Sequence, residues 1–358
     1  MLPFEKSLAG KRILVTGHTG FTGSWVSTWL VEIGATVGGF ALAPVTSPSL
    51  YVATGLDDHV NSIIGDVRDL AALRAAMEEF RPDGVLHLAA QPLVRASYTQ
   101  PVETFDINVM GTVNVLEAAR HCASVKSVVC VTTDKVYRNN EWEWPYREND
   151  PLGGKDPYSA SKSAAEMVID SYRLSFANGH SMKIATARGG NIIGGGDWSD
   201  DRLVPDFVRA VTTGSKLTLR YPDATRPWQH VMALAQGYLM LLASLFEEAT
   251  PAARAWNLGP HDTRQHSVRD VLAMMCAEWE SPSMDLMDSP LSEARALALD
   301  SSLAANVLGW SPPWDTPRVV TETARWYREY YRDPAGAAAI TREQLARWRT
   351  DLHHTMLR

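Results

Sequence analysis

The chain has 358 residues, of which 45% are hydrophobic and 21% charged, a composition typical of a soluble globular protein large enough for two lobes. Its formal charge of −7 disfavours sequence-independent binding to nucleic acid, no apolar run is long enough to cross a membrane, and the first residues lack the apolar core of a signal peptide. Cys122, Cys130 and Cys276 are widely spaced, which predicts reduced thiols in a cytoplasmic protein and neither a disulfide nor a metal site.

The first predicted strand, residues 11–16, runs into a glycine-rich turn. Gly17, Gly20 and Gly23 follow with the spacing Gly-x-x-Gly-x-x-Gly, and a helix is predicted over residues 24–33. Without side chains at these positions the backbone can approach a pyrophosphate, and the N-terminus of a helix attracts the anion. We therefore interpret the turn as a dinucleotide-binding turn, with a glycine turn that binds nothing as the alternative.

The next two strands bear on which dinucleotide would bind. A strand is predicted over residues 35–42, but its end is apolar and offers no acid for a ribose hydroxyl. No Lys or Arg occurs from there to Val67, so nothing would meet a 2′-phosphate, which favours NAD over NADP by default. Residues 60–65 form the third predicted strand. Asp66 follows it, and would either accept from an adenine amino group or cap the helix predicted over residues 70–80.

A fourth strand is predicted over residues 84–90 and ends in Leu-Ala-Ala, whose small side chains would let a dinucleotide lie against the backbone. A long amphipathic helix is predicted next, over residues 101–121, with Asn108 in its interior. An asparagine inside a helix is unfavourable unless its side chain is used. We therefore expect the Asn108 side chain to be used.

The stretch that is most informative about chemistry begins with an apolar strand over residues 128–131. Thr-Asp-Lys at residues 133–135 follows its carboxyl end, where open α/β sheets bind ligands. Tyr158 and Lys162 then open a helix predicted to reach residue 177, and their spacing puts them on one face. An ammonium group beside a phenol favours the phenolate, which suits an acid–base device. The alternative is a Tyr–Lys pair on an ordinary surface helix.

Strands and helices alternate up to a sixth strand over residues 183–188, which predicts an α/β fold with a doubly wound parallel sheet. Residues 189–198 are too rich in glycine for regular structure and are interpreted as a loop that lines a ligand. Residues 220–230 are dense in Arg, Trp and His, which suits phosphate contacts and stacking on a base, with a charged surface loop as the alternative. A helix over residues 231–246 and a short strand over 255–258 follow.

Together these motifs resemble the extended short-chain dehydrogenase/reductase superfamily, on Thr-Gly-x-x-Gly-Phe-x-Gly at 16–23, Gly-Asp at 65–66, Leu-Ala-Ala at 88–90 and Tyr-x-x-x-Lys at 158–162. Within it the chain is most similar to the family of CDP-glucose 4,6-dehydratases. That narrower resemblance lies in Gln-Pro-Leu-Val-Arg at 91–95, Thr-Asp-Lys at 133–135, Asn-Ile-Ile-Gly-Gly-Gly-Asp-Trp at 191–198 and Arg-Pro-Trp-Gln-His at 226–230.

The resemblance implies NAD-dependent 4,6-dehydration of a nucleotide hexose, with CDP-glucose as the substrate. A hydride passes from C4 to NAD, water is lost across C5 and C6, and the hydride returns to C6. By resemblance, Tyr158 acts on O4 while Lys162 lowers its pKa, and Thr133 binds O4. Asp134 protonates the leaving hydroxyl and Lys135 removes the C5 proton. The resemblance further implies deoxysugar biosynthesis of the kind that supplies lipopolysaccharide O-antigen.

The resemblance also implies two sets of binding residues. Those for NAD are Gly17, Gly20, Phe21, Gly23, Asp66, Val67, Leu88, Ala89, Ala90, Thr132, Tyr158 and Lys162. Those for the nucleotide sugar are Gln91, Asn191, Arg202, Arg226 and His230. Three positions depart from the family's common residues: Thr22 and Ala298 stand where Lys is common, and Lys155 where Tyr is common.

We expect a Rossmann domain of residues 1–190 and about 229–260, and a smaller substrate-binding domain of about 191–228 and 261–358. Apolar residues on more than one face of the helices at 101–121 and 158–177 predict a homo-oligomer, with a four-helix dimer interface as the superfamily implies. Two other functions stay open from the sequence. One is a dehydratase, epimerase or reductase of another nucleotide sugar, and the other is an NAD-binding interaction module without catalysis.

Overall fold

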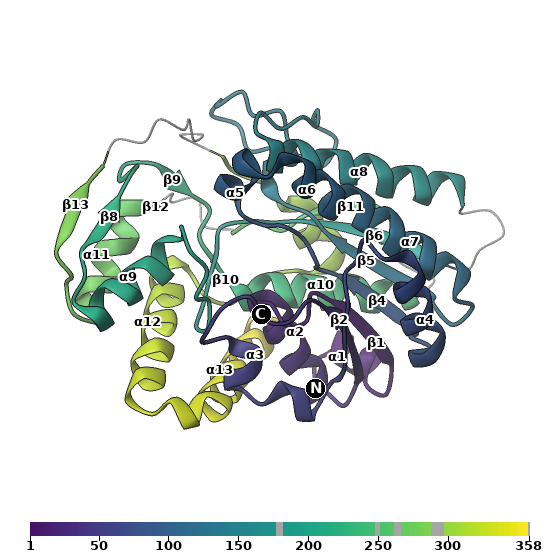
Figure 1. Ribbon diagram of the computed structural model, residues 1–358, viewed down its shortest axis with the longest axis horizontal. Helices are drawn as coiled ribbons and strands as arrows, with labels where there is room; N and C mark the ends of the chain where they lie inside the picture. Colours follow the sequence, from purple (N-terminus) through teal and green to yellow (C-terminus); the bar gives the residue numbers. More distant parts are fainter. Residues whose placement is uncertain (177–181, 248–250, 261–265, 288–296, 357–358) are drawn as a thin grey trace.

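The computed structural model describes residues 1–176, 182–247, 251–260, 266–287 and 297–356 (Figure 1). Its centre is a seven-stranded parallel sheet in the order β11-β6-β5-β4-β1-β2-β3, which confirms the predicted doubly wound fold. The strands of this sheet are β1 (Arg12–Thr16), β2 (Thr36–Ala41), β3 (Asn61–Ile64), β4 (Gly84–His87), β5 (Ser127–Val131), β6 (Lys183–Arg188) and β11 (Ala255–Asn257).

Side chains alternate between the two faces of the sheet, as the pleat requires. Leu14, Val85, Val128 and Ile184 are register partners across four neighbouring strands, and all four lie in one buried cluster. Apolar neighbours along the strands, such as Ile13, Leu86 and Val129, belong to the larger cluster on the opposite face. Both faces are therefore apolar, because helices cover both of them.

Helices pack on each face of the sheet (Figure 1). On one side lie α1 (Pro3–Leu8), α2 (Phe21–Glu32) and α10 (Val231–Phe246). On the other lie α4 (Leu70–Phe80), α6 (Pro101–Phe105), α7 (Gly111–His121) and α8 (Pro157–Ser175). The helix expected over residues 101–121 is divided by a π-helical turn at Asp106–Met110, and position 177, the predicted end of the α8 helix, lies outside the described residues.

The rest of the described chain forms a second region beside the carboxyl ends of the strands (Figure 1). Its helices are α9 (Leu203–Thr213), α11 (Val268–Glu278) and α12 (Thr316–Arg332). Its strands form three pairs, which are β7 (Ile192–Ile193) with β10 (Gln229–His230), β9 (Thr225–Arg226) with β12 (His266–Ser267), and β8 (Leu217–Leu219) with β13 (Met284–Leu286). The last helix, α13 (Ala337–Met356), turns back and packs on α3 (Leu50–Ala53), close to the nucleotide-binding half. The two-domain division stays a prediction. No helix in the described ranges is long and apolar enough to cross a membrane.

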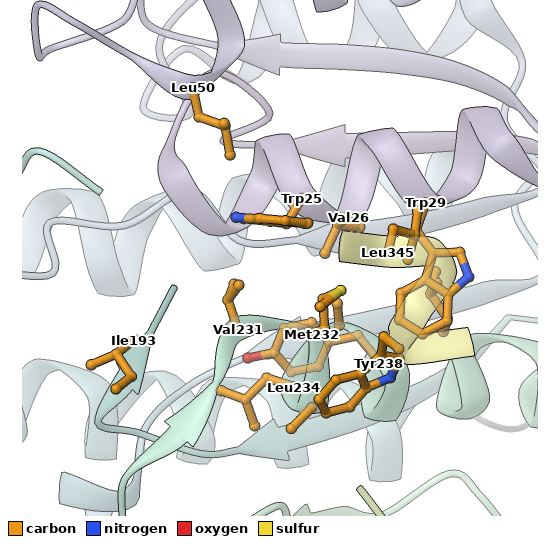
Figure 2. Close-up of a cluster of buried hydrophobic side chains, with 14 of the residues drawn as sticks. Trp25, Val26, Trp29, Leu50, Ile193, Val231, Met232, Leu234, Tyr238 and Leu345 are labelled. Carbon is orange, nitrogen blue, oxygen red and sulfur yellow. The ribbon is translucent and has the colours of Figure 1, made fainter. Parts of the chain in front are cut away.

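Helices α2 and α10 pack together within the larger buried cluster. Figure 2 shows Trp25 and Trp29 of α2 facing Met232 and Tyr238 of α10, with Leu345 of α13 at the side. Helix α10 is apolar around most of its circumference and is buried along its length, as expected for a helix that is enclosed on all sides.

A buried carboxylate joins the two ends of the chain within this core. Glu5 of α1 is fully buried and accepts hydrogen bonds from Trp29 Nε1 at 2.8 Å and from Arg349 Nε of α13 at 2.7 Å. Its second oxygen accepts from Leu2 N at 2.8 Å. All of these donors compensate the desolvation of one charge, so its removal should cost far more than the loss of a surface pair.

We expect Glu5→Gln to lower the free energy of unfolding by about 2 kcal/mol, because Arg349 would lose its charged partner in a largely dry site. The matched control is Glu32→Gln, which removes an exposed pair with Arg342 between α2 and α13 and should cost less than about 1 kcal/mol. Urea denaturation of both variants measures the difference. Equal losses in the two variants would contradict the role given to Glu5.

Candidate active site

A pocket of about 790 Å³ opens at the carboxyl ends of the strands. The strand order reverses between β1 and β4, and open α/β sheets bind their ligands at such a reversal. Most of the predicted site residues line this single pocket. They are Gly17, Gly20, Phe21, Gly23, Asp66, Val67, Leu88, Ala89, Ala90, Thr132, Thr133, Lys135, Tyr158, Lys162, Asn191, Arg202 and Arg226.

The glycine turn after β1 has little room for side chains. Gly17 has a φ of 76°, and a Cβ there would lie 2.8 Å from the backbone nitrogen of Ala89. A Cβ on Gly23 would lie 2.1 Å from the carbonyl oxygen of Gly17. Helix α2 therefore packs directly on the turn and begins at Phe21, earlier than predicted, with no side-chain cap at Gly20. Its first backbone N–H groups suit an anion.

Asp66 lies on the pocket wall. It does not cap α4, so the helix-capping role that was one of its two predicted roles is wrong. The N-cap of α4 is Asp69, which accepts from Ala72 N at 3.0 Å. Asp66 pairs with Arg68 at 2.6 Å, and the hydrogen bond from Arg68 holds the pKa of Asp66 below its usual value. The adenine-binding role of Asp66 remains a prediction.

At the end of β5 the chain turns into a short 3-10 turn, η3 (Asp134–Val136), so that consecutive side chains point in different directions. Lys135 lines the pocket, whereas Asp134 is fully buried behind it. The Asp134 carboxylate accepts from Thr133 Oγ1 at 2.9 Å and from Asn191 Nδ2 at 2.9 Å, and Lys135 Nζ lies 3.6 Å away. The structure thus brings Asn191 against Asp134, a contact that the sequence did not indicate.

Tyr158 and Lys162 open α8 on the face toward the pocket, as predicted, and both are almost completely buried. Burial raises the pKa of Tyr158 to about 12, which Thr133 opposes through a hydrogen bond. The resemblance implied that Lys162 lowers this pKa, but in the structure the burial of the phenol outweighs every opposing effect. Burial also lowers the pKa of Lys162 to about 8, and its Nζ donates to the carbonyl of Val131 at 3.3 Å.

A buried ion pair lies directly behind this face. Glu166 of α8 accepts from Arg188 of β6 at 2.8 Å, and it also accepts from Thr132 Oγ1 at 2.5 Å. Arg188 Nη1 also donates a hydrogen bond to Tyr137 Oη at 2.9 Å. Sequence reasoning missed Glu166 and Arg188 because a Glu within a helix and an Arg at a strand end are usually solvated. The pair supports the strand end on which the predicted acid–base residues lie.

Gln91 and His230, both predicted to bind substrate, are not among the residues that line the pocket. The Asn108 side chain accepts from Gln91 N through Oδ1 and donates to the Gln91 carbonyl through Nδ2. Its Nδ2 also donates to Ser161 Oγ at 2.9 Å, which confirms that the Asn108 side chain is used. His230 is fully buried and caps α10 by accepting from Met232 N at 3.2 Å. It packs against the rings of Trp25, Trp314 and Trp348. Burial lowers its pKa to about 3, so the imidazole is neutral.

The pocket is also lined by charged residues that were not in the predicted set. Arg95, Asp201 and Arg220 lie on its wall, and the departures at Thr22 and Lys155 lie there too. Ala298, the third departure, is not among the residues that line the pocket, and its carbonyl accepts from Tyr146 N at 2.9 Å. Arg95 and Arg220 occur within stretches that the sequence had singled out, but nothing in their spacing showed that they meet.

Comparison with known proteins agrees with this geometry. Relatives include a CDP-glucose 4,6-dehydratase of Salmonella typhimurium, 44% identical over 90% of this chain and 92% of its own length. They also include a dTDP-glucose 4,6-dehydratase of Streptomyces antibioticus, 31% identical over 92% of this chain and 98% of its own. A solved UDP-glucose 4-epimerase of Thermus thermophilus in complex with NAD superposes with a TM-score of 0.76 at 26% identity, covering 88% of this chain and 99% of that chain.

The parallel sheet, the glycine turn after β1 and the Tyr–Lys pair on α8 define a Rossmann-fold protein of the extended short-chain dehydrogenase/reductase superfamily. The sequence model of the GDP-mannose 4,6 dehydratase family matches residues 14–323, which is most of the chain. The chain therefore belongs to that family and is a homologue of CDP-glucose 4,6-dehydratase.

The burial of Lys162 leads to a prediction about stability. Because its pKa is about 8 in the folded chain and about 10.5 when exposed, the unfolded state binds more protons between these values, and stability rises with pH there. At pH 7 the buried ammonium should cost up to about 3 kcal/mol. We expect Lys162→Met, measured without NAD, to raise the free energy of unfolding at pH 7 and to lose that advantage near pH 10.5.

The control is Lys216→Met, which removes a lysine that is largely exposed beside Asp285. Its effect on the free energy of unfolding should be small and nearly independent of pH. Urea denaturation from pH 7 to 10.5 would measure both variants. A Lys162→Met protein that is no more stable than wild type at pH 7 would contradict the assigned burial cost.

Proposed function

We propose that the protein catalyses the NAD-dependent conversion of CDP-D-glucose to CDP-4-dehydro-6-deoxy-D-glucose. The observation that carries this proposal is the Thr133–Asp134–Lys135 sequence at the end of β5, beside Tyr158 and Lys162 at one pocket. Dehydration across C5 and C6 needs a base at C5 and an acid at O6, in addition to the base at O4. The 44% identity to a CDP-glucose 4,6-dehydratase supports CDP-glucose as the substrate.

The nucleotide-binding half of the pocket fits NAD. A side chain at Gly17 or Gly23 would collide with backbone, so the turn presents bare peptide groups where a pyrophosphate would lie. Asp66, Val67 and Leu88–Ala90 would continue along the dinucleotide, and Thr132, Tyr158 and Lys162 would hold its nicotinamide end. NAD bound there would supply the acceptor of the C4 hydride and the donor of the hydride to C6.

The protein groups would handle the protons. Tyr158 would take the proton from O4, because it is the phenol that lines the pocket beside Thr133. Lys135 would remove the C5 proton, and Asp134 would protonate the leaving O6 hydroxyl. Because Asp134 lies behind the pocket wall and is bonded to Asn191, it must turn toward the substrate to do so. Arg202 and Arg226, which also line the pocket, would contact the substrate diphosphate.

The reaction would belong to deoxysugar biosynthesis in the cytoplasm, with lipopolysaccharide O-antigen as the pathway that the sequence resemblance implies. All three cysteines are unpaired, which suits a reducing compartment.

The test is incubation of the pure protein with NAD and a panel of CDP-, dTDP-, UDP- and GDP-hexoses. We expect CDP-glucose to yield a 4-keto-6-deoxy sugar, which absorbs in alkali. Lys135→Met should still oxidise C4 but stall before elimination, because the C5 base is lost. It should therefore accumulate NADH and take up no solvent deuterium at C5. General acid–base residues contribute about 10²–10⁴-fold, so the loss should be large.

Two controls separate the steps. Tyr158→Phe should fail earlier and form no NADH, whereas Lys6→Met, an exposed lysine on α1, should behave as wild type. Near-normal elimination by Lys135→Met would place the C5 base elsewhere. Loss of NADH formation in that variant would instead make Lys135 a binding residue. Production of an epimer and no keto sugar by the wild-type protein would disprove the dehydratase assignment.

We also propose that the protein is a homodimer. Helices α6–α7 and α8 bury Leu116 and Ile169 against the sheet. Their outer face leaves apolar side chains in solvent, with Val102 83%, Met167 63% and Leu174 73% exposed. Apolar residues on this scale along two adjacent helices are typical of an association surface. A second copy would bury them in a four-helix interface, as the superfamily resemblance implies.

Sedimentation would test the dimer. We expect wild type to be dimeric at micromolar concentration and Met167→Glu to be monomeric, because a carboxylate would be desolvated in an apolar interface. Leu286→Glu changes a comparably exposed leucine on β13, so that variant should stay dimeric. A monomeric wild-type protein would refute the prediction.

A further inference from the structure

Three charged side chains meet on the pocket wall between the two halves of the molecule. Arg95 belongs to α5 (Val94–Thr99) of the nucleotide-binding half, whereas Asp201 precedes α9 and Arg220 follows β8 (Leu217–Leu219) (Figure 1). Asp201 Oδ1 lies 2.8 Å from Arg95 Nη1 and 2.9 Å from Arg220 Nη2. All three line the pocket, so a ligand there can reach them.

These contacts are poorly placed to stabilise the fold. The side chains are 38%, 36% and 27% exposed for Arg95, Asp201 and Arg220, and partly exposed pairs contribute little. Asp201 also has a φ of 59°, a left-handed conformation that costs energy for a residue with a side chain. The buried Nε of Arg220 has no hydrogen-bond partner in the part of the chain that the structure describes. Strain and an unused donor are typical of a functional site.

The charges of the cluster do not balance. One carboxylate oxygen is shared by two guanidinium groups, which leaves a charge of +1 among these three side chains. Asp206, which also lines the pocket, is paired with Arg209. The planar fork of a guanidinium matches phosphate oxygens as well as it matches a carboxylate. A diphosphate would present more negative charge and more acceptor oxygens than the single carboxylate that the two arginines share.

We propose that Arg95 and Arg220 bind the diphosphate of the nucleotide sugar, and that Asp201 is an internal counter-ion which this diphosphate displaces. The inference rests on the proposed function, which supplies the nucleotide sugar. Its consequence has a definite sign. Because the diphosphate must break two ion pairs to reach the arginines, Asp201 weakens nucleotide binding. A residue that merely joined the two halves of the protein would strengthen binding.

The experiment is calorimetric titration of CDP into the NAD-loaded protein and its variants. Asp201→Asn keeps the shape of the side chain but removes its charge, so it should tighten CDP binding by about three- to tenfold, the size expected for two partly exposed pairs. Arg95→Gln and Arg220→Gln should each weaken CDP binding about tenfold. Neither arginine substitution should change the affinity for cytidine, which has no phosphate.

The matched control is Asp223→Asn, which removes the same charge from an exposed pair with Arg269 that does not line the pocket. It should leave CDP affinity unchanged. In an Asp201→Asn background, Arg95→Gln should cost more than it does alone, because Arg95 is then no longer shared with Asp201. Both proteins in that background carry Asp201→Asn, so any change that this substitution makes in the local backbone affects both alike.

The outcomes separate the inference from the function on which it rests. If CDP binds wild type but Asp201→Asn leaves its affinity unchanged or weaker, the counter-ion role is overturned and the proposed function stands. Arginine variants that bind CDP like wild type would also overturn the inference. A wild-type protein that binds neither CDP nor CDP-glucose would overturn the proposed function and this inference together.

Discussion

The buried ion pair between Glu166 of α8 and Arg188 of β6 joins the helix that carries Tyr158 and Lys162 to the central sheet. Both side chains are at most 5% exposed, and two charges so far from water are tolerated only while each compensates the other. The same Glu166 carboxylate accepts from Thr132, the residue directly before the predicted acid–base residues. Lys162 lies one turn before Glu166 on the same helix, and its Nζ donates to the carbonyl of Val131, the residue before Thr132.

The site built on this support is dry, and its dryness opposes the charges that the chemistry needs. Burial raises the pKa of Tyr158 and lowers that of Lys162, so that each group favours its neutral form. At pH 7 the buried Lys162 ammonium therefore costs stability, and Tyr158 must lose its own proton before it can act as a base at O4. The fully buried Glu5 and its hydrogen bonds to both chain ends lie elsewhere in the core and add stability away from the site.

Much of the fold could be predicted because it depends on local patterns. The apolar runs of the strands, the alternation with helices and the three glycines after β1 were enough for the parallel sheet and its ligand-binding edge. The details that differed depend on contacts. Helix α2 can start at Phe21 because Gly23 has no side chain to collide with the Gly17 carbonyl. Strand β4 ends at His87, and the residues that follow it line the pocket.

The sequence by itself determined the order of strands and helices, the edge where ligands bind, and the shared face of Tyr158 and Lys162, because spacing along one element decides all of these. Only the tertiary structure decided what distant segments do to one another. In the folded chain His230 packs among aromatic rings in the core, Asn191 lies against Asp134, and Asp201 lies between two arginines. Those outcomes depend on packing between residues far apart in the chain, which no local pattern of polarity records.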